Sequence, residues 1–213
     1  MAETDVGAVY DRVADDYADR FPSTEPEQPV ELALVAHFAA LVSGSGGQVL
    51  DAGCGAGRML PVLAAAGCSP VGIDLSSGMV RRARQDHPEF DVRVGSLGAL
   101  PFPDGSFDGF FSWYSTIHTP DEQLGAVFAE ACRVLRPGGH LLVAFQAGRG
   151  RQEVAGGYRR LGHDVELWRH DRTPDQVAAG LRVAGFAEVA RLVRAPAAGE
   201  RTDQAVLVAR SAG

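Results

Sequence analysis

The chain contains no lysine and no asparagine, so all 20 residues counted as lysine plus arginine are arginine. Without a lysine side chain, no Schiff base can form with pyridoxal phosphate or with a carbonyl substrate. No lysine is present to contact a nucleotide phosphate, as it does in P-loop proteins and kinases. These absences exclude a large group of enzyme mechanisms before any motif is considered.

Excess positive charge and long apolar runs are also missing. The net charge of -7 argues against a broad nucleic-acid-binding face. No apolar run approaches the roughly 18 residues of a membrane span, and the MAETDVG start does not resemble a signal peptide. Cys54, Cys68 and Cys132 lack disulfide-framework or zinc-ribbon spacing, and His163 and His170 lack metal-ligand spacing. We therefore expect a cytoplasmic protein with no metal and no nucleic-acid or membrane partner.

Short apolar strands alternate with helical patterns from 48 to 186. This alternation predicts a mostly parallel sheet with helices on both faces. Two final strands, near 189–193 and 205–209, have no helical pattern between them, which favours an antiparallel pair. Two amphipathic helices, near 5–20 and 34–42, precede the first strand.

Two helix starts share the same local chemistry. The sequences TPDE at 119–122 and TPDQ at 173–176 each place a threonine before a proline, with Glu or Gln three residues after the threonine. This spacing predicts a threonine N-cap and a capping box at both helices. Residues 147–172 are polar and rich in glycine and arginine, and they show no clear period.

The sequence VLDAGCGAG at 49–57 joins a short strand to a helix through a glycine-rich turn. Glycines allow the backbone to approach a ligand closely. Asp74 ends the next strand, where an acid can accept hydrogen bonds from two ribose hydroxyls. Arg58 stands where a dinucleotide fingerprint requires glycine, and Asp51 would disfavour a pyrophosphate. The turn therefore suits a cationic group such as an amine or a sulfonium.

Three further motifs extend the pattern: VGIDLSSGMVRRAR at 71–84, VGSLGALPFPDGSFDGFFSWYSTIH at 94–118 and EACRVLRPGGHLLVAF at 130–145. Together with the glycine turn, the chain resembles the class I S-adenosylmethionine-dependent methyltransferases, in particular small bacterial members with WYSxIH after the fourth strand. The resemblance implies a three-layer α/β/α Rossmann-like sandwich. Its seven-stranded, mostly parallel sheet would have the order 3-2-1-4-5-7-6, with the last strand antiparallel.

The resemblance also implies a cofactor and a reaction. The cofactor would be S-adenosylmethionine, the product S-adenosylhomocysteine, and the acceptor a small molecule, with methylation of oxygen or nitrogen favoured. Asp51 and the turn backbone would hold the methionine part, Asp74 the ribose, and Leu75 and Met79 the adenine; many relatives have an acid where Ser96 stands. The implied cofactor-binding residues are Tyr10, Asp51, Ala52, Gly53, Cys54, Gly55, Asp74, Leu75, Met79, Gly95, Ser96, Leu97, Ser112 and Trp113.

His118 is the candidate general base because it follows the fourth strand, at the end of the sheet where ligands bind in such folds. Alternatively, His118 only bonds to nearby backbone or closes the cofactor pocket. Tyr114 and Tyr17 complete the set of candidate catalytic residues. Tyr114 shares the loop with His118, and Tyr17 lies on a helix that would cover the site.

We expect one domain over 1–213, acting as a monomer or a homodimer. Its parts would be an N-terminal helical lid (1–44), a cofactor-binding core (48–146), a substrate-side insert (147–172) and a C-terminal helix with two strands (173–213). A solvated surface loop is the alternative for the insert. Two functional alternatives stay open: a nicotinamide-dependent oxidoreductase, and a protein of this fold that binds the cofactor without transferring a methyl group.

Overall fold

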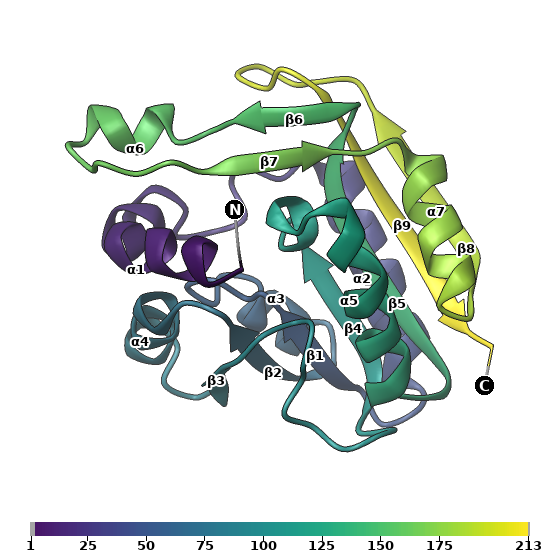
Figure 1. Cartoon of the computed structure of the whole chain (residues 1–213). Helices are drawn as coiled ribbons and strands as arrows, with labels where there is room; N and C mark the ends of the chain where they lie inside the picture. Colours follow the sequence, from purple (N-terminus) through teal and green to yellow (C-terminus); the bar gives the residue numbers. More distant parts are fainter. Residues whose placement is uncertain (1–2, 213) are drawn as a thin grey trace.

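The computed structural model describes residues 3–212; residues 1, 2 and 213 of the predicted domain lie outside this range. Within it, one sheet has seven strands in the order β3-β2-β1-β4-β5-β9-β8 (Figure 1). Their bounds are β1 Gln48–Ala52, β2 Ser69–Asp74, β3 Val92–Val94, β4 Phe107–Trp113, β5 Leu135–Ala147, β8 Phe186–Arg194 and β9 Asp203–Ser211. Strands β1 to β5 are parallel, and β9 is antiparallel to both of its neighbours. This confirms the predicted order, because the short strands β6 and β7 form a separate pair.

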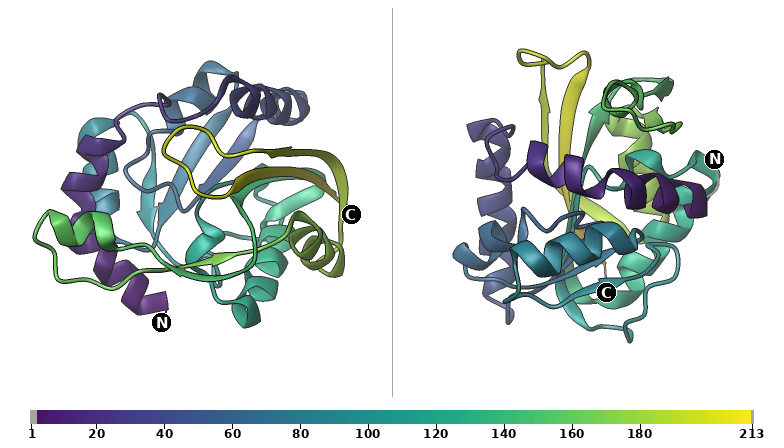
Figure 2. Two further views of the ribbon diagram at one scale, coloured as in Figure 1. Left: turned by 90° about the horizontal axis from the view of Figure 1, so that it is seen from above. Right: turned by 90° about the vertical axis from the view of Figure 1, so that its left-hand side faces the viewer.

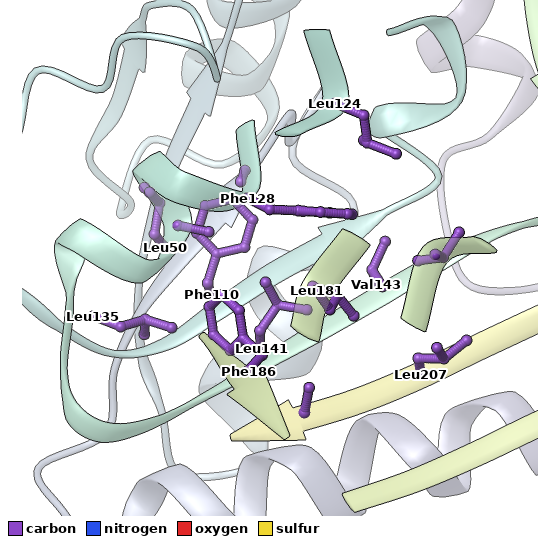
Figure 3. Close-up of a cluster of buried hydrophobic side chains, with 14 of the residues drawn as sticks. Leu50, Phe110, Leu124, Phe128, Leu135, Leu141, Val143, Leu181, Phe186 and Leu207 are labelled. Atoms are coloured by element: carbon purple, nitrogen blue, oxygen red, sulfur yellow. The ribbon is translucent and has the colours of Figure 1, made fainter. Parts of the chain in front are cut away.

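Helices cover both faces of the sheet, as predicted. On one face, α5 (Asp121–Val134) and α7 (Pro174–Val183) pack on the strands through a cluster that includes Phe110, Phe128 and Leu181 (Figure 3). On the other face, α2 (Pro29–Ser43) and α3 (Leu60–Ala65) pack through a second cluster. Helix α4 (Ser77–Asp86) packs beside β2 and β3. Each large apolar side chain buried in this way contributes roughly 1.5–3 kcal/mol.

The two predicted capping boxes have different outcomes. The Thr173 box is confirmed, since its hydroxyl accepts the N–H of Gln176 and the Gln176 side chain accepts the N–H of Thr173. The Thr119 cap is wrong. A 3-10 turn, Thr116–His118, precedes α5, and Pro120 takes the N-cap position without a side-chain bond. Thr119 ends that turn, and its carbonyl accepts a hydrogen bond from Arg172.

The segment 147–172 is ordered, although its sequence shows no period. Strand β6 (Gly150–Glu153) pairs with β7 (Trp168–Asp171), and α6 (Gly156–Arg160) lies between them. All four residues of β6 are exposed, so no apolar alternation could mark it as a strand. The segment from β6 to β7 (residues 150–171), which includes α6, forms an arm. This arm projects beyond the main sheet and reaches over α1 (Glu3–Arg20), as Figures 1 and 2 show.

Helix α1 is held between this arm and α4. Val9 of α1 packs with Ala155, Val165 and Leu167 of the arm in one buried cluster. On its other side, Asp11 accepts hydrogen bonds from the Ser76 hydroxyl and the Gly78 N–H, at 2.7 and 2.8 Å, at the start of α4. Of the helices within residues 3–212, none has the length and apolar character that crossing a membrane requires.

Candidate functional site

A cavity of about 420 Å³ lies where the carboxyl ends of β1, β2 and β4 meet the underside of α1. This volume falls in the range of small-molecule sites, roughly 300–1,000 Å³. The position is the one at which open α/β sheets bind ligands. The wall combines acidic, aromatic and glycine positions.

Asp51, near the end of β1, is a buried acid of the cavity wall. Its side chain is 1% exposed, and Oδ2 has no hydrogen-bond partner among the described residues. Burial raises the pKa of Asp51 to about 8, with Arg58 acting in the opposite direction and Asp74 in the same direction. An unpartnered buried carboxylate oxygen is costly in a folded protein, and a cationic ligand in the cavity would satisfy it.

The glycine turn after β1 has the backbone form that its sequence indicates. Gly53 has φ +78°, and an added Cβ would lie 2.3 Å from Cβ of Ser115. Ser115 Oγ donates to the Ala52 carbonyl at 2.5 Å. Since a hydroxyl has one proton, Ser112 must be the donor in its 2.8 Å bond with Ser115 Oγ. The two serines therefore fix the loop after β4 against the turn, which leaves room only for glycine at position 53.

Asp74, at the end of β2, is tied to the same turn. Its Oδ2 accepts the N–H of Gly55 at 2.8 Å, and its Oδ1 accepts the N–H of Ser76 at 2.9 Å. Burial raises the pKa of Asp74, and the N–H groups of Ser76 and Gly55 oppose this rise. Each carboxylate oxygen keeps further lone pairs, so the oriented acid can still accept from ligand hydroxyls.

His118 joins α1 to the arm. Its Nδ1 lies 2.6 Å from the Trp168 carbonyl oxygen, and its Nε2 lies 2.8 Å from the Tyr10 hydroxyl. A carbonyl only accepts, so Nδ1 carries the proton, and Nε2 accepts from Tyr10. Burial lowers the pKa of His118 to about 4, although the bond to Trp168 opposes this change. The imidazole is therefore neutral at physiological pH.

Two buried acids from the α1–α2 region hold the aromatic side of the cavity. Glu27 Oε1 accepts from Arg58 Nη1 at 2.5 Å and from Trp113 Nε1 at 3.0 Å. Glu31 Oε1 accepts from the Tyr114 hydroxyl at 3.0 Å. Both acids lie between the two N-terminal helices that the sequence predicted, and no local spacing pointed to them.

The structure brings most of the predicted site residues to this one cavity. Its wall includes Tyr10, Tyr17, Asp51, Gly53, Cys54, Gly55, Asp74, Leu75, Met79, Ser96, Leu97, Trp113, Tyr114 and His118. Three predicted residues lie behind the wall instead, namely Ala52, Gly95 and Ser112. Burial raises the pKa of the Cys54 thiol well above its usual value, which keeps it protonated and unreactive.

Several wall residues were missed by the sequence reasoning. They are Val6, Gly7, Arg58, Met59, Ser76, Gly98, Ala99, Ser115, Thr119, Pro120, Gln123, Ala126 and Val127. Ser115 belongs to the WYS motif and could have been identified there. The residues from the start of α5 carry no such signal. Within residues 3–212, no three His, Cys, Asp or Glu side chains group as a metal site would require.

Comparison with known proteins gives these features a context. Residues 49–139 match the profile of a family described as a methyltransferase domain. A probable S-adenosylmethionine-dependent methyltransferase of Mycolicibacterium smegmatis is 38% identical over 101 residues, which are 47% of this chain and 38% of that protein. The matched segments span 29% to 39% of the first curated relatives.

Two solved structures share the fold over almost the whole chain. Magnesium protoporphyrin IX methyltransferase from Synechocystis, with S-adenosylhomocysteine bound, has a TM-score of 0.70 at 20% identity and covers 99% of this chain and 100% of its own. The 4+2 cyclase SpnF has a TM-score of 0.72 at 21% identity and covers 99% and 96%. At these identities, the likeness concerns the fold alone.

Proposed function

We propose that this chain, which belongs to the class I S-adenosylmethionine-dependent methyltransferase family, transfers a methyl group to a small-molecule acceptor at oxygen or nitrogen. The cofactor of the family, S-adenosylmethionine, supplies when bound a methyl group that its sulfonium makes electrophilic. The chain's own residues bind and orient the reactants, and they exclude water. The observation that carries the proposal is the unpartnered Oδ2 of Asp51 in the cavity wall.

The residues present fit this cofactor. Asp51 offers a buried carboxyl group, which a bound ammonium would favour in its ionised form, beside glycines that let the backbone approach. Asp74 offers oriented carboxylate oxygens to the ribose hydroxyls, since its bonds to Gly55 and Ser76 fix its direction. Leu75 and Met79 offer an apolar wall to the adenine.

The acceptor side is assigned to the aromatic part of the cavity. Tyr17, Tyr114 and His118 line it, and α1 and the arm close over it. A neutral hydroxyl or amine must lose a proton when it is methylated, and a neutral imidazole in the wall can accept one. We therefore regard residues 1–44 as a lid and 147–172 as a substrate-side insert; residues 1 and 2 lie outside the described range.

Two binding experiments and one assay test this function. We expect S-adenosylhomocysteine to raise the melting temperature of the protein, and NADH not to do so. The opposite result would support a nicotinamide-dependent oxidoreductase and refute the proposal. The protein is then incubated with S-adenosylmethionine and a panel of small phenols, alcohols and amines. Formation of S-adenosylhomocysteine that depends on one of these acceptors would demonstrate methyl transfer.

A second reaction class must be separated from methyl transfer, because the fold does not determine the reaction. SpnF, which shares the fold with a TM-score of 0.72, is a cyclase. Tight binding of S-adenosylhomocysteine without acceptor-dependent turnover across the panel would favour a cofactor-binding protein with another activity. Turnover with any acceptor would exclude that alternative.

A further inference from the structure

We propose that the Tyr10 hydroxyl, rather than His118 itself, meets the methyl acceptor and relays its proton to Nε2 of His118. The inference rests on the proposed function and specifies how the acceptor loses its proton. Both ring nitrogens of His118 are already engaged, by Tyr10 at 2.8 Å and by the Trp168 carbonyl at 2.6 Å. Neither nitrogen is therefore open to an acceptor in the cavity.

The direction of the hydrogen bonds follows from the chemistry of the groups. The Trp168 carbonyl accepts from Nδ1–H, so Nε2 has a lone pair and Tyr10 must donate its only proton to it. The Tyr10 oxygen then has only its lone pairs to offer to other partners, and Tyr10 lines the cavity. A hydroxyl or amine of an acceptor can donate to that oxygen. The chain thus presents a proton-accepting atom to the acceptor without any ionised side chain.

The relay consists of two coupled proton transfers. The acceptor's O–H or N–H bond breaks, and its proton bonds to the Tyr10 oxygen. The former Tyr10 proton bonds to Nε2 of His118, and the electron pair of the acceptor's broken bond stays on its heteroatom. Tyr10 ends as a neutral phenol and His118 as an imidazolium that still donates to Trp168. No oxidant, reductant or further reactant takes part.

The surroundings of the pair favour neutral resting forms. Burial raises the pKa of Tyr10 well above its usual value and lowers that of His118 to about 4. The charged and titratable groups that influence the two side chains come from several packed elements: Tyr17, Asp74, Tyr158, Arg169 and His170. In the resting protein, Nε2 of His118 therefore carries no proton. The imidazolium forms only when the acceptor loses its proton during the reaction.

Packing from two distant segments holds the relay in place. The Tyr10 ring contacts the His118 ring edge-on, with centroids 5.5 Å apart, and Tyr10 also packs against the buried arm cluster. Arg172, 5% exposed at the base of the arm, donates to the carbonyls of Thr116 and Thr119 on either side of His118. The arm thus contributes both the partner of Nδ1 and the anchor of the turn that bears the imidazole.

The first test uses the free protein and needs no acceptor. Nitrogen NMR of the His118 ring should show a proton on Nδ1, none on Nε2, and titration well below the usual histidine range. In Tyr10→Phe, the Nε2 resonance should shift and the pKa of His118 should rise, because the donor that favours the neutral ring is gone. Val154→Ala, in the same cluster but outside the cavity wall, should change neither. A proton on Nε2, or a Tyr10→Phe spectrum equal to that of the wild type, would overturn the relay.

The second test follows turnover with a hydroxyl acceptor from the panel. Below the acceptor's own pKa, and with S-adenosylmethionine at saturation so that cofactor affinity does not enter, Tyr10→Phe should lower kcat by roughly 10²-fold or more. Above that pKa the acceptor is already ionised, so the deficit should disappear. A deficit that is equal at all pH values would refute the relay while leaving methyl transfer intact. If no acceptor turns over, the proposed function fails, and the NMR result still decides how the relay is built.

Discussion

The Tyr114 hydroxyl donates a hydrogen bond of 3.0 Å to the buried carboxylate of Glu31. Tyr114 has φ 55°, and among the non-glycine residues that the structure describes it alone has a positive φ. That conformation costs roughly 1–2 kcal/mol, and strain of this kind is common at functional sites. Glu31 also accepts from Arg194 at 3.1 Å, so one carboxylate links α2, the loop after β4 and the end of β8.

Glu31→Ala should destabilise the protein strongly. The substitution removes the acceptor of Tyr114 and one of the two acids paired with Arg194. Breaking a buried ion pair costs about 3–5 kcal/mol, and we expect the lower end because Glu200 still pairs with Arg194. Urea unfolding measures the change. Glu188→Ala, which breaks a more exposed pair with Arg191, should cost no more than about 1 kcal/mol. Equal losses would show that Glu31 does not hold the loop.

Asp51 should make the free protein less stable as the pH rises. Its pKa is about 8 in the folded protein and about 4 in the unfolded chain. Between these values the folded state keeps a proton that the unfolded state has lost, so the free energy of unfolding falls with increasing pH, and the fall ends above about pH 8. In Asp51→Asn, the melting temperature should fall less, or rise more, across this window than in the wild type, because only the Asp51 contribution is lost while those of Asp74 and His118 remain. A wild-type slope in the variant would assign the effect to another group.

The same carboxyl should release a proton when a cationic ligand binds. Near neutral pH Asp51 is protonated in the free protein, and an ammonium group beside it favours the carboxylate. Calorimetry with S-adenosylhomocysteine in two buffers of different ionisation enthalpy should therefore give different heats. Asp51→Asn should give equal heats and weaker binding. Equal heats with the wild type would mean that the ligand's amino group lies elsewhere.

Asp74→Ala should weaken binding of S-adenosylhomocysteine by about 1–3 kcal/mol, because buried hydroxyls would lose their acceptor. The Gly55 and Ser76 N–H groups would lose their partners as well. Asp74→Asn, which keeps one acceptor oxygen, should have a smaller effect. Asp91→Ala, which breaks an exposed pair with Arg93, is the matched control. Calorimetric affinity equal to that of the wild type would refute the ribose assignment.

Gly53→Ala and Gly199→Ala separate backbone strain from steric overlap. Both glycines have positive φ, +78° and +90°, but a Cβ on Gly199 would have no atom within 4 Å. The Gly199 variant should lose only the roughly 1–2 kcal/mol of the unfavourable φ. The Gly53 variant should lose clearly more, because its Cβ overlaps Ser115 at 2.3 Å. Urea midpoints compare the two, and similar losses would show that Ser115 moves away at little cost.

The lid assignment predicts a local change in backbone protection. Hydrogen exchange should slow in α1 and in the arm when S-adenosylhomocysteine binds, because the ligand would contact the underside of α1. Helix α7 contributes no residue to the cavity wall, so its exchange should change little. Uniform slowing over the whole chain would indicate global stabilisation instead of closure.

The sequence predicted those elements whose cause is local. Strand β4 was expected at 107–113 and is found there, because four of its residues are aromatic and all seven are buried. The Thr119 cap failed because Thr119 closes the 3-10 turn that precedes α5, and the helix begins one residue later, after Pro120. The arm escaped notice because β6 is exposed on both faces and pairs only with β7.

The site divides in the same way. Asp51, the glycine turn and Asp74 were found because strand, turn and acid follow one another at a recognisable spacing. Glu27 and Glu31 were not found, because each meets the cavity residues only when residues 27–31 fold against the end of β4 and the loop after it. In the sequence, each is a single acid with the same local pattern as a solvated surface charge.

The two partners of His118 come from distant parts of the chain, one on α1 and one on β7. The tautomer of the imidazole is therefore defined only when both segments are in place over the cavity. If α1 and the arm move as the proposed lid requires, the closure that excludes water would also complete the hydrogen bonds of His118. In an open molecule, His118 would lack one or both of these partners. Such a molecule would have little capacity to transfer the methyl group to a wrong nucleophile.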